Sequence, residues 1–282
     1  MSDLPPMHVV IVAYGSPLLL ESCLRALGDG FEVVIVDNSS SENVSALAGL
    51  HSCRYIDPGT NIGFAAGINR AIAELGPDHG DLLLLNPDAR IGGDVVRRLQ
   101  DELRSPGHDR VACVSPSLYG DDGAPCRVEW PFPSPLRAWS EALKLGSLGT
   151  QRGFLIGAAL MLRREAIASL GGFDERYFLY AEETDWQWRA TRAGWSVMLC
   201  PRLAGAHTGA GTSSDMDRRE ALFHASAERY IRKWHGDVGW RVFQTGVLFG
   251  AGARAIIGPN RAQHRDRFSR YLHGPLRQVD QS

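Results

Sequence analysis

The sequence lacks cysteine pairs at the spacing that disulfide frameworks or zinc sites require. Its five cysteines are far apart in the chain: Cys23, Cys53, Cys113, Cys126 and Cys200. Small secreted domains rely on dense cysteine frameworks and structural zinc sites on C-x-x-C pairs, so neither class of protein is indicated. The pattern favours free thiols in a reducing compartment.

Long apolar runs are also missing. Residues 1–7 contain Asp3 and two prolines where a secretory signal peptide has a basic region and an apolar stretch, so no signal peptide is predicted. Residues 240–257 are apolar but are interrupted by Arg241 and Arg254. This stretch is too short and too charged to span a bilayer comfortably. We therefore expect a cytoplasmic protein.

The chain as a whole is nearly neutral, but its C-terminal segment has a clear excess of positive charge. The net charge is −2 over 282 residues. Residues 229–282 contain ten Lys and Arg against three Asp and Glu, a net charge of +7, which leaves −9 for the rest. An acidic body argues against nucleic-acid binding. The basic, partly apolar end suits either packing on the domain or peripheral contact with an anionic membrane surface, at the inner face of the cell membrane.

Apolar strands alternate with helices along most of the sequence. Strands are predicted at 8–13, 32–36, 54–57, 81–85, 111–115, 155–162 and 195–200. Helices are predicted at 18–27, 41–50, 63–75 and 93–104, and the Pro-rich stretch 125–135 is expected to be a loop. This alternation is typical of an α/β fold with a mostly parallel central sheet flanked by helices. We expect one domain over residues 1–215 and a helical, basic segment over 216–282.

Two of the predicted strands end in polar residues. The strand at 32–36 runs into residues 37–40, Asp-Asn-Ser-Ser, and the strand at 81–85 runs into residues 86–89, Asn-Pro-Asp-Ala. Either tetrapeptide alone is also a common turn. Ligands of open α/β sheets bind beyond the carboxyl ends of the strands, so the two together favour a binding site.

A segment rich in small residues, Asn61 to Asn69, lies between these two motifs. At a helix start, its backbone N–H groups can approach a phosphate or ribose closely, although the glycines also suit close helix packing. The segment is not G-x-G-x-x-G, and the turn after the first strand lacks that pattern too. A nicotinamide-cofactor site is therefore disfavoured.

A cluster of carboxylates, Glu182, Glu183 and Asp185, stands at a predicted helix start. The helix dipole favours one or two acids there. A third acid, close to aromatic residues, indicates shifted pKa values and a role in proton transfer. Asp185 also has a structural alternative, because Arg189 lies one helical turn later and suits an ion pair.

Read in order, these motifs resemble family-2 glycosyltransferases of the GT-A fold, particularly the bacterial rhamnosyltransferase-like branch. The resemblance spans about residues 7–207 and also includes Gly171 to Glu175. It implies a GT-A fold and an inverting transferase that uses a nucleotide-diphospho-sugar, with dTDP-L-rhamnose as the leading donor. The implied acceptor is a hydroxyl of a glycan or a polyprenyl-linked saccharide.

The resemblance also implies roles for single residues. It places a nucleotide-sugar site at Ala13, Tyr14, Asp37, Asn61, Gly63, Gly67, Asn69, Asn86 and Asp88. Asp88 and His207 are the implied ligands of Mn²⁺ or Mg²⁺, hard cations that suit diphosphate oxygens. Glu183 is the implied catalytic base, with Glu182 and Asp185 as the other catalytic acids. Phe178 and Trp186 are the expected acceptor contacts.

Two other functions use similar residues. A sugar-nucleotide pyrophosphorylase needs a basic, Gly-rich loop after the first strand, but no Arg or Lys precedes Arg25. A noncatalytic nucleotide- or glycan-binding module has no need for the acid cluster alongside Asp88. Transfer is therefore the favoured interpretation, and the sequence carries no signal for an oligomeric state.

Overall fold

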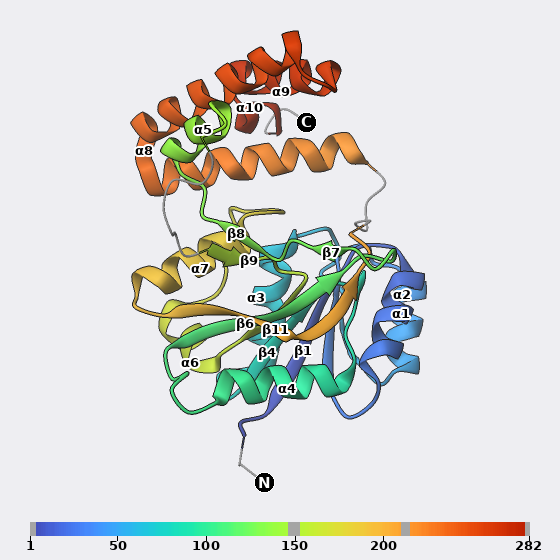
Figure 1. Cartoon of the computed structure of the whole chain (residues 1–282). Helices are drawn as coiled ribbons and strands as arrows, with labels where there is room; N and C mark the ends of the chain where they lie inside the picture. The colour runs from blue at the N-terminus through green and yellow to red at the C-terminus, as the bar shows by residue number, and fades with distance from the viewer. Residues whose placement is uncertain (1–3, 146–152, 210–214, 280–282) are drawn as a thin grey trace. The chain divides into compact units, whose positions relative to one another are not determined.

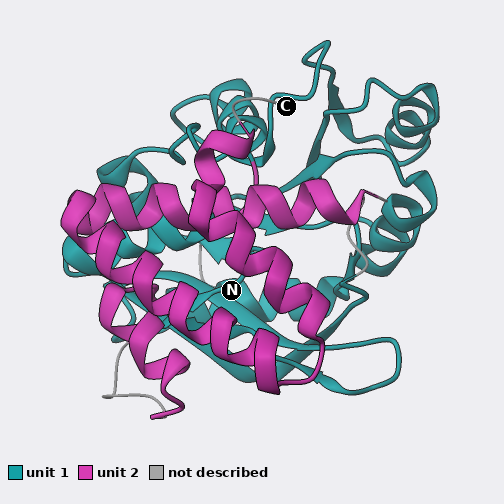
Figure 2. Cartoon of the chain, turned by 90° about the horizontal axis from the view of Figure 1, so that it is seen from above, with its two compact units in different colours: residues 1–130, 153–178, 182–214 teal, residues 131–152, 179–181, 215–282 magenta. Residues whose placement is uncertain are grey.

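The computed structural model describes residues 4–145, 153–209 and 215–279, which belong to two compact units (Figures 1 and 2). The first unit takes in residues 1–130, 153–178 and 182–214, and the second takes in 131–152, 179–181 and 215–282. The second unit thus includes the expected C-terminal segment together with two pieces from earlier in the chain. Asp3, cited above for the absence of a signal peptide, lies outside the described residues.

The first unit is an α/β unit, as the alternation predicts. Its elements are β1 (Met7–Ala13), α1 (Pro17–Leu27), β2 (Glu32–Asp37), α2 (Glu42–Leu50), β3 (Arg54–Ile56), α3 (Phe64–Leu75), β4 (Asp81–Leu85), β5 (Ala89–Arg90), α4 (Gly93–Arg104), β6 (Val111–Tyr119), β7 (Pro125–Cys126), β8 (Glu129–Pro131), β9 (Gly153–Leu155), β10 (Ala159–Leu162), α6 (Arg164–Leu170), α7 (Glu182–Arg192) and β11 (Ser196–His207). Every strand and helix predicted up to residue 104 is confirmed.

The main sheet has the strand order β3-β2-β1-β4-β10-β6-β11-β5, with β7 beside β6 (Figure 1). The strands from β3 to β4 are parallel to one another, as are β6 and β11. Strands β10 and β5 run antiparallel to their neighbours. The sheet is therefore parallel in its first half and mixed in its second, where the expectation of a mostly parallel sheet does not hold.

Two predicted elements of the second half differ for a local reason. The single strand predicted at 155–162 is divided by a turn at residues 156–158. Strand β9 therefore pairs with β8 in a separate small sheet, while β10 enters the main sheet. The predicted loop at 125–135 contains the short strands β7 and β8.

Helix α3 packs closely on the central strand β1. A Cβ atom at Gly67 would lie 2.9 Å from Val12 Cγ1, so the helix can take its position only because residue 67 has no side chain. Strand β1 is buried along its length from His8 to Ala13. Helix packing thus explains the glycine at residue 67, and the implied role of Gly67 in nucleotide binding stays a prediction.

The second unit is helical. It contains α5 (Pro135–Ala142), α8 (Met216–Ile257), α9 (Arg261–His273) and α10 (Pro275–Val279). Helix α8 is bent at Gly236, whose φ of 67° interrupts the helical backbone. Inside this unit His224 Nδ1 lies 3.1 Å from the Tyr271 hydroxyl, and burial lowers the pKa of His224 to about 3.

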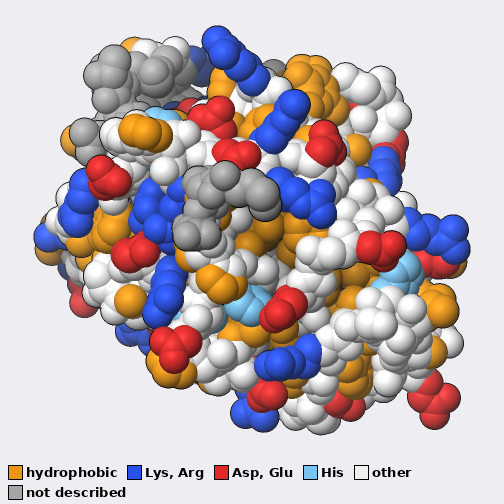
Figure 3. Space-filling view, turned by 90° about the horizontal axis from the view of Figure 1, so that it is seen from below, with side chains coloured by type: hydrophobic (Ala, Val, Ile, Leu, Met, Phe, Trp, Pro, Cys, Tyr) orange, Lys and Arg blue, Asp and Glu red, His pale blue; other side chains and the backbone are white. Residues whose placement is uncertain are grey.

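The described helices and surfaces show two further features. None of these helices combines the length and the apolar character that crossing a bilayer requires. The face seen in Figure 3, apart from its grey atoms, has acidic and basic side chains interspersed among hydrophobic ones. No broad region of a single charge is visible there.

Substitution of Gly67 by alanine tests the packing of α3 on β1. The added methyl group must displace Val12 or the helix, so we expect Gly67→Ala to lower the free energy of unfolding by about 1–3 kcal/mol. The matched control is Gly49→Ala in α2, where a Cβ meets nothing within 4 Å. That change should stabilise the protein by about 0.5–1 kcal/mol. Urea unfolding of both variants measures the difference, and equal effects would refute the packing role.

Candidate functional site

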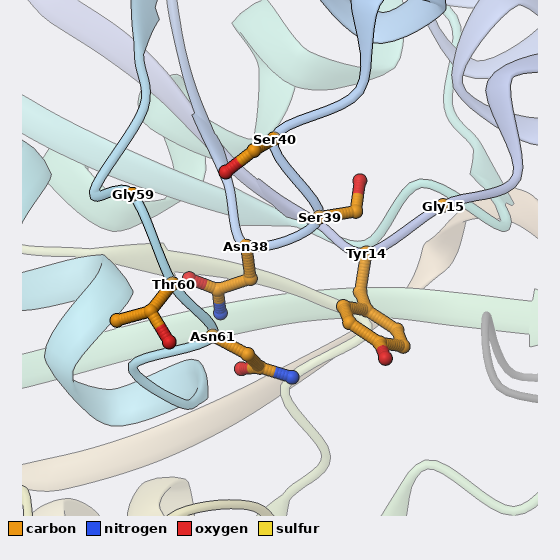
Figure 4. Close-up of a pocket in the computed structure, with 8 residues that line it drawn as sticks. All are labelled: Tyr14, Gly15, Asn38, Ser39, Ser40, Gly59, Thr60 and Asn61. Carbon is orange, nitrogen blue, oxygen red and sulfur yellow. The ribbon is translucent and has the colours of Figure 1, made fainter.

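A hollow of about 600 Å³ lies beyond the carboxyl ends of β1, β2 and β3. Its lining residues are Tyr14, Gly15, Asn38, Ser39, Ser40, Gly59, Thr60 and Asn61. In Figure 4 the ring of Tyr14 and the amides of Asn38 and Asn61 face a common space. Of the residues assigned to the nucleotide-sugar site, Tyr14 and Asn61 line this hollow directly.

Asp37 fixes the loop that forms one wall of the hollow. The residue is fully buried, and its carboxylate accepts hydrogen bonds from Ser39 N at 2.9 Å and Ser39 Oγ at 2.5 Å. It also accepts from Ser41 N at 2.7 Å and from the Tyr55 hydroxyl at 3.0 Å. Burial and the bond to Asp37 raise the pKa of Tyr55 to about 12, which keeps this donor protonated. The structure thus gives Asp37 a positioning role, and its direct contact with a base stays a prediction.

Gly63 connects Asn38 and Asn61, two residues that line the hollow, through hydrogen bonds. Its N–H donates to Asn61 Oδ1 at 3.0 Å and its carbonyl accepts from Asn38 Nδ2 at 3.1 Å. Gly63 has a φ of 85°, and a Cβ there would lie 2.6 Å from the Phe178 carbonyl oxygen, so only glycine fits. Asn38 Oδ1 is buried and has no hydrogen-bond partner among the described residues. An acceptor is therefore left over in a residue that lines the hollow.

Asp88 and His207 meet because of the pairing between β5 and β11. His207 is aligned with Ala89 in this antiparallel pair, which leaves its Nε2 3.3 Å from Asp88 Oδ1. The two side chains are 15 % and 5 % exposed. The structure thus brings together two residues that are 119 positions apart in the chain, and their binding of a metal stays a prediction.

The residues around Asp88 fit a cation that is shared with a bound donor. The pair combines a carboxylate with an imidazole, and Asn86, two residues before Asp88, has a buried Oδ1 without a hydrogen-bond partner among the described residues. Such donors suit Mn²⁺ or Mg²⁺, which prefer six ligands and take the remainder from phosphate and water. Within the described ranges no group of three or more His, Cys, Asp or Glu side chains could hold a metal alone.

Glu182 and Glu183 open helix α7 with little access to water. Glu182 is 4 % exposed, and Oε2 of each residue has no hydrogen-bond partner in the described part of the chain. Burial, reinforced by the charge of Glu183, raises the pKa of Glu182 well above its usual 4.5. Burial also raises the pKa of Glu183, against the stabilising N–H groups of Glu183, Thr184 and Gly157. Both shifts move the pKa values upward, the direction that favours proton uptake by a general base.

The turn at residues 156–158 links the acid pair to the Asp88 region. Its Gly157 lies against Glu183, and the neighbouring Ala158 carbonyl accepts from Asn86 N at 2.9 Å. Gln187 holds α7 beside this turn by accepting from Leu155 N at 2.8 Å and donating to Leu155 O at 2.7 Å. Sequence reasoning missed Gln187. The available signal was its position one helical turn after Glu183, on the same side of α7.

Asn69 does not face the hollow. Its Nδ2 donates to Phe173 O at 2.8 Å and to Glu175 Oε1 at 2.8 Å, and its Oδ1 accepts from Phe173 N at 2.8 Å. A Cβ at Gly172 would lie 2.3 Å from Asn69 Oδ1, which explains the glycine of this turn. The implied nucleotide contact of Asn69 is therefore corrected, because the side chain is used to hold the turn at 171–175.

Two residues of α7 are likewise structural. Asp185 is fully buried and pairs with Arg189 Nε at 3.2 Å, so the ion pair expected across one helical turn is present and a catalytic role is not supported. Trp186 is fully buried, stacks on Phe173 with ring centroids 5.9 Å apart and donates to Gly171 O at 3.1 Å. The expectation that Trp186 contacts an acceptor is corrected, since it is a core residue.

The backbone just before the acid pair is unusual. Tyr180 and Ala181 have φ values of 69° and 66°, a left-handed conformation that side chains rarely adopt. Phe178 O accepts from Phe64 N at 2.7 Å. Within the second unit, Ser226 Oγ donates to Leu179 O at 2.8 Å. These contacts hold a strained turn that leads directly into Glu182, as is common at functional sites.

The remaining assigned residues are placed as follows. Ala13 is buried at the end of β1, and its carbonyl accepts from Asn38 N at 2.8 Å, so it joins the two strand ends below the hollow. The ring of Phe178 packs against Gly63, where a Cβ would lie 2.9 Å from Phe178 Cδ2. The contact of Phe178 with an acceptor stays a prediction.

The family model described as glycosyl transferase family 2 matches residues 8–171. The chain belongs to this family. This glycosyltransferase is 29% identical over 279 residues to the N-acetylglucosaminyl-diphospho-decaprenol L-rhamnosyltransferase of Mycobacterium tuberculosis, a match that covers 85% of this chain and 89% of the relative. It is 26% identical over 213 residues to the low-salt glycan biosynthesis hexosyltransferase Agl10 of Haloferax volcanii, covering 72% and 67%.

Solved structures share the architecture of the glycosyltransferase. One is the mannosyltransferase PcManGT from Pyrobaculum calidifontis in complex with GDP-Man and Mn2+, with a TM-score of 0.59 at 14% identity. The match covers 99% of this chain and 79% of the PcManGT chain. Glucosyl-3-phosphoglycerate synthase from Mycobacterium tuberculosis, with Mn2+ and UDP, has a TM-score of 0.55 at 17% identity and covers 80% of each chain. The predicted GT-A fold is confirmed.

The burial of Glu182 predicts that this residue lowers the stability of the folded protein at neutral pH. Its pKa is raised in the folded protein, so the folded state binds the proton more tightly and the wild type loses stability as pH rises above 4.5. We expect Glu182→Gln to raise the Tm relative to wild type at about pH 7.5, with the gain vanishing at about pH 4. The control is Glu42→Gln, an exposed acid in the first turn of α2. A Glu182→Gln variant less stable than wild type at both pH values would contradict the desolvation argument.

Proposed function

We propose that this enzyme transfers L-rhamnose from dTDP-L-rhamnose, with inversion, to a hydroxyl of a polyprenyl-linked saccharide. The observation that carries the proposal is the pair of Glu182 and Glu183, whose Oε2 atoms are both buried, joined through the turn at 156–158 to the loop that bears Asn86 and Asp88. The name of the mycobacterial relative supports both the donor sugar and the lipid-linked acceptor.

The hollow at Tyr14, Asn38 and Asn61 suits a nucleoside. The Tyr14 ring is 39% exposed and offers a face for stacking on a base. Asn38 Oδ1, which lacks a partner among the described residues, is an acceptor that matches the ring N–H of thymine or uracil. Ser39 and Ser40 donate their hydroxyl protons to Asp37 and Asp57, so in this arrangement they accept from the ribose hydroxyls, and Thr60 supplies a hydroxyl for the phosphates.

Asp88, His207 and Asn86 would hold the diphosphate end of the donor through a divalent cation. A bound Mn²⁺ or Mg²⁺ supplies positive charge that offsets the negative charge growing on the leaving diphosphate. The pairing of β5 with β11 brings Asp88 and His207 together for this role.

Glu183 is the proposed catalytic base. The acceptor oxygen bonds to the anomeric carbon from the face opposite the leaving group, the bond from that carbon to the phosphate oxygen breaks, and the hydroxyl proton moves to the Glu183 carboxylate. The raised pKa of Glu183 favours this proton transfer. Glu182, whose Oε2 is also unpartnered among the described residues, keeps the local charge density high and shapes the acceptor side.

Replacing Glu183 by glutamine should remove the base while keeping the volume. General-base catalysis is worth about 10²–10⁴-fold, so we expect a fall in kcat of that size with donor Kd unchanged within about threefold. Glu182→Gln, one residue earlier in the same turn, is the matched control and should retain more activity. Rhamnosyl transfer at saturating donor measures both. Loss of kcat in Glu182→Gln alone would make Glu182 the base.

Calorimetric titration tests the donor assignment. We expect dTDP-rhamnose to bind more tightly than UDP- or GDP-sugars, and only with Mn²⁺ present. Asp88→Ala should weaken that binding by about tenfold or more and abolish its response to chelator, because a charged ligand is lost. Binding that is equal with Mn²⁺ and with chelator in the wild type would refute the cation site. No binding of any donor would favour a noncatalytic glycan-binding module.

A polyprenyl-linked acceptor resides in a membrane, so we also propose that the enzyme works at the inner surface of the cell membrane as a peripheral protein. The net charge of +7 over residues 229–282 supports attraction to anionic lipids.

A further inference from the structure

The second half of α8 carries a line of exposed apolar side chains. Val238, Val242, Phe249 and Ile256 are separated by four, seven and seven residues, a spacing that sets them on one side of a helix. Each is 36–75% exposed. Helix α8 is thus amphipathic beyond its bend at Gly236, with an apolar side that its own unit leaves uncovered.

Helix α5 extends this line into a continuous surface. Leu136 and Leu143 are exposed, and they share one side of α5 with Trp139. Trp139 stacks on Phe249 with centroids 5.7 Å apart, and its Nε1 donates to Val242 O at 2.9 Å. These contacts place the exposed apolar side chains of α5 beside those of α8. We call the surface formed by Leu136, Trp139, Leu143, Val242, Phe249 and Ile256 the α5–α8 apolar face.

The close packing of the two helices gives this face a fixed shape. A Cβ at Gly246 would lie 3.1 Å from Trp139 Cδ1, and a Cβ at Gly250 would lie 3.1 Å from Ala142 Cβ. Arg254 Nη2 donates to Glu141 O at 2.9 Å and closes the far end of the pair. The apolar face is therefore held by glycine contacts and a cap, and it does not depend on a ligand for its form.

Isolated exposed leucines are normal on protein surfaces, whereas contiguous apolar patches mark interaction sites. Lys144 and Arg241 are exposed next to this face in sequence, and residues 229–282 carry a net charge of +7. A second copy of this chain docked on the same face would bring two such segments together, which like-charge repulsion opposes. A bilayer with anionic headgroups satisfies both the apolar side chains and the cations.

We infer that the α5–α8 apolar face inserts into the headgroup region of an anionic lipid bilayer. The inference rests on the proposed function in one respect, since a lipid-linked acceptor gives the enzyme a reason to dock there. Leu136, Phe249 and Ile256 enter the acyl boundary, while Lys144 and Arg241 remain at the level of the headgroups. The interaction is peripheral, because the helices lie along the surface and do not cross it.

Vesicle flotation with the full chain tests the inference. The wild type should float with vesicles that contain on the order of 30% phosphatidylglycerol and only weakly with phosphatidylcholine vesicles. The double variant Leu136→Gln/Ile256→Gln should lose at least about tenfold in partitioning, because two apolar side chains no longer enter the bilayer. Both side chains are exposed, so the fold should be unaffected, and circular dichroism verifies this.

The matched control is Leu18→Gln/Leu50→Gln, which changes two comparably exposed leucines of the first unit, at 80% and 74% exposure. It should float like the wild type. Equal loss in the two double variants, or no loss in either, would overturn the inference. A wild-type dimer in light scattering that Leu136→Gln/Ile256→Gln converts to a monomer would also overturn it and would make the face an interface between copies.

The flotation assay contains neither donor nor acceptor, so it separates this inference from the proposed function. Flotation that depends on the apolar face, together with failure to bind any nucleotide-sugar, would refute the transferase proposal alone. Transfer of rhamnose to a short-chain, water-soluble acceptor without any flotation would refute the docking face alone.

Discussion

The main physical constraint on the candidate site is that Glu182 and the Oε2 atom of its neighbour Glu183 lie out of water at the start of α7. Burying one charge is unfavourable, and burying two neighbours of the same sign is more so. The surrounding contacts compensate locally, through the backbone N–H groups at the helix start and through Gly157. A protein that used these residues only for stability would have little reason to retain them, since neutral side chains of similar size carry no such penalty. The arrangement supports the proposal that these two residues belong to the active site.

Several elements from distant parts of the chain converge to hold this pair. Gln187 fixes α7 to β9 through both polar groups of Leu155, and the left-handed turn at Tyr180 and Ala181 sets where the helix begins. The carbonyl of Leu179 is bound by Ser226 of α8. Within the second unit, this bond and the left-handed backbone at Tyr180 and Ala181 order the residues that precede Glu182 in the chain.

The sequence was sufficient for the alternation of strands and helices, and for the meeting of Asp88 with His207 through the family pattern. It was insufficient where one motif contains both ligand-facing and structural residues. Asn61 and Asn69 belong to one segment, yet Asn61 lines the hollow while Asn69 bonds to Phe173, 104 residues later. Such a partner depends on tertiary packing that local spacing does not encode. The same holds for β10, whose direction follows from a short turn within one apolar run.

The central claim is that the hollow at the strand ends and the Asp88–His207 pair form one donor site served by the acids of α7. A crystal structure of the enzyme with dTDP and Mn²⁺, using the anomalous signal of manganese, tests it most directly. The account predicts a manganese peak in coordination contact with both Asp88 and His207, and thymine between Tyr14 and Asn38. Manganese bound away from Asp88, or a nucleotide bound outside this hollow, would contradict it.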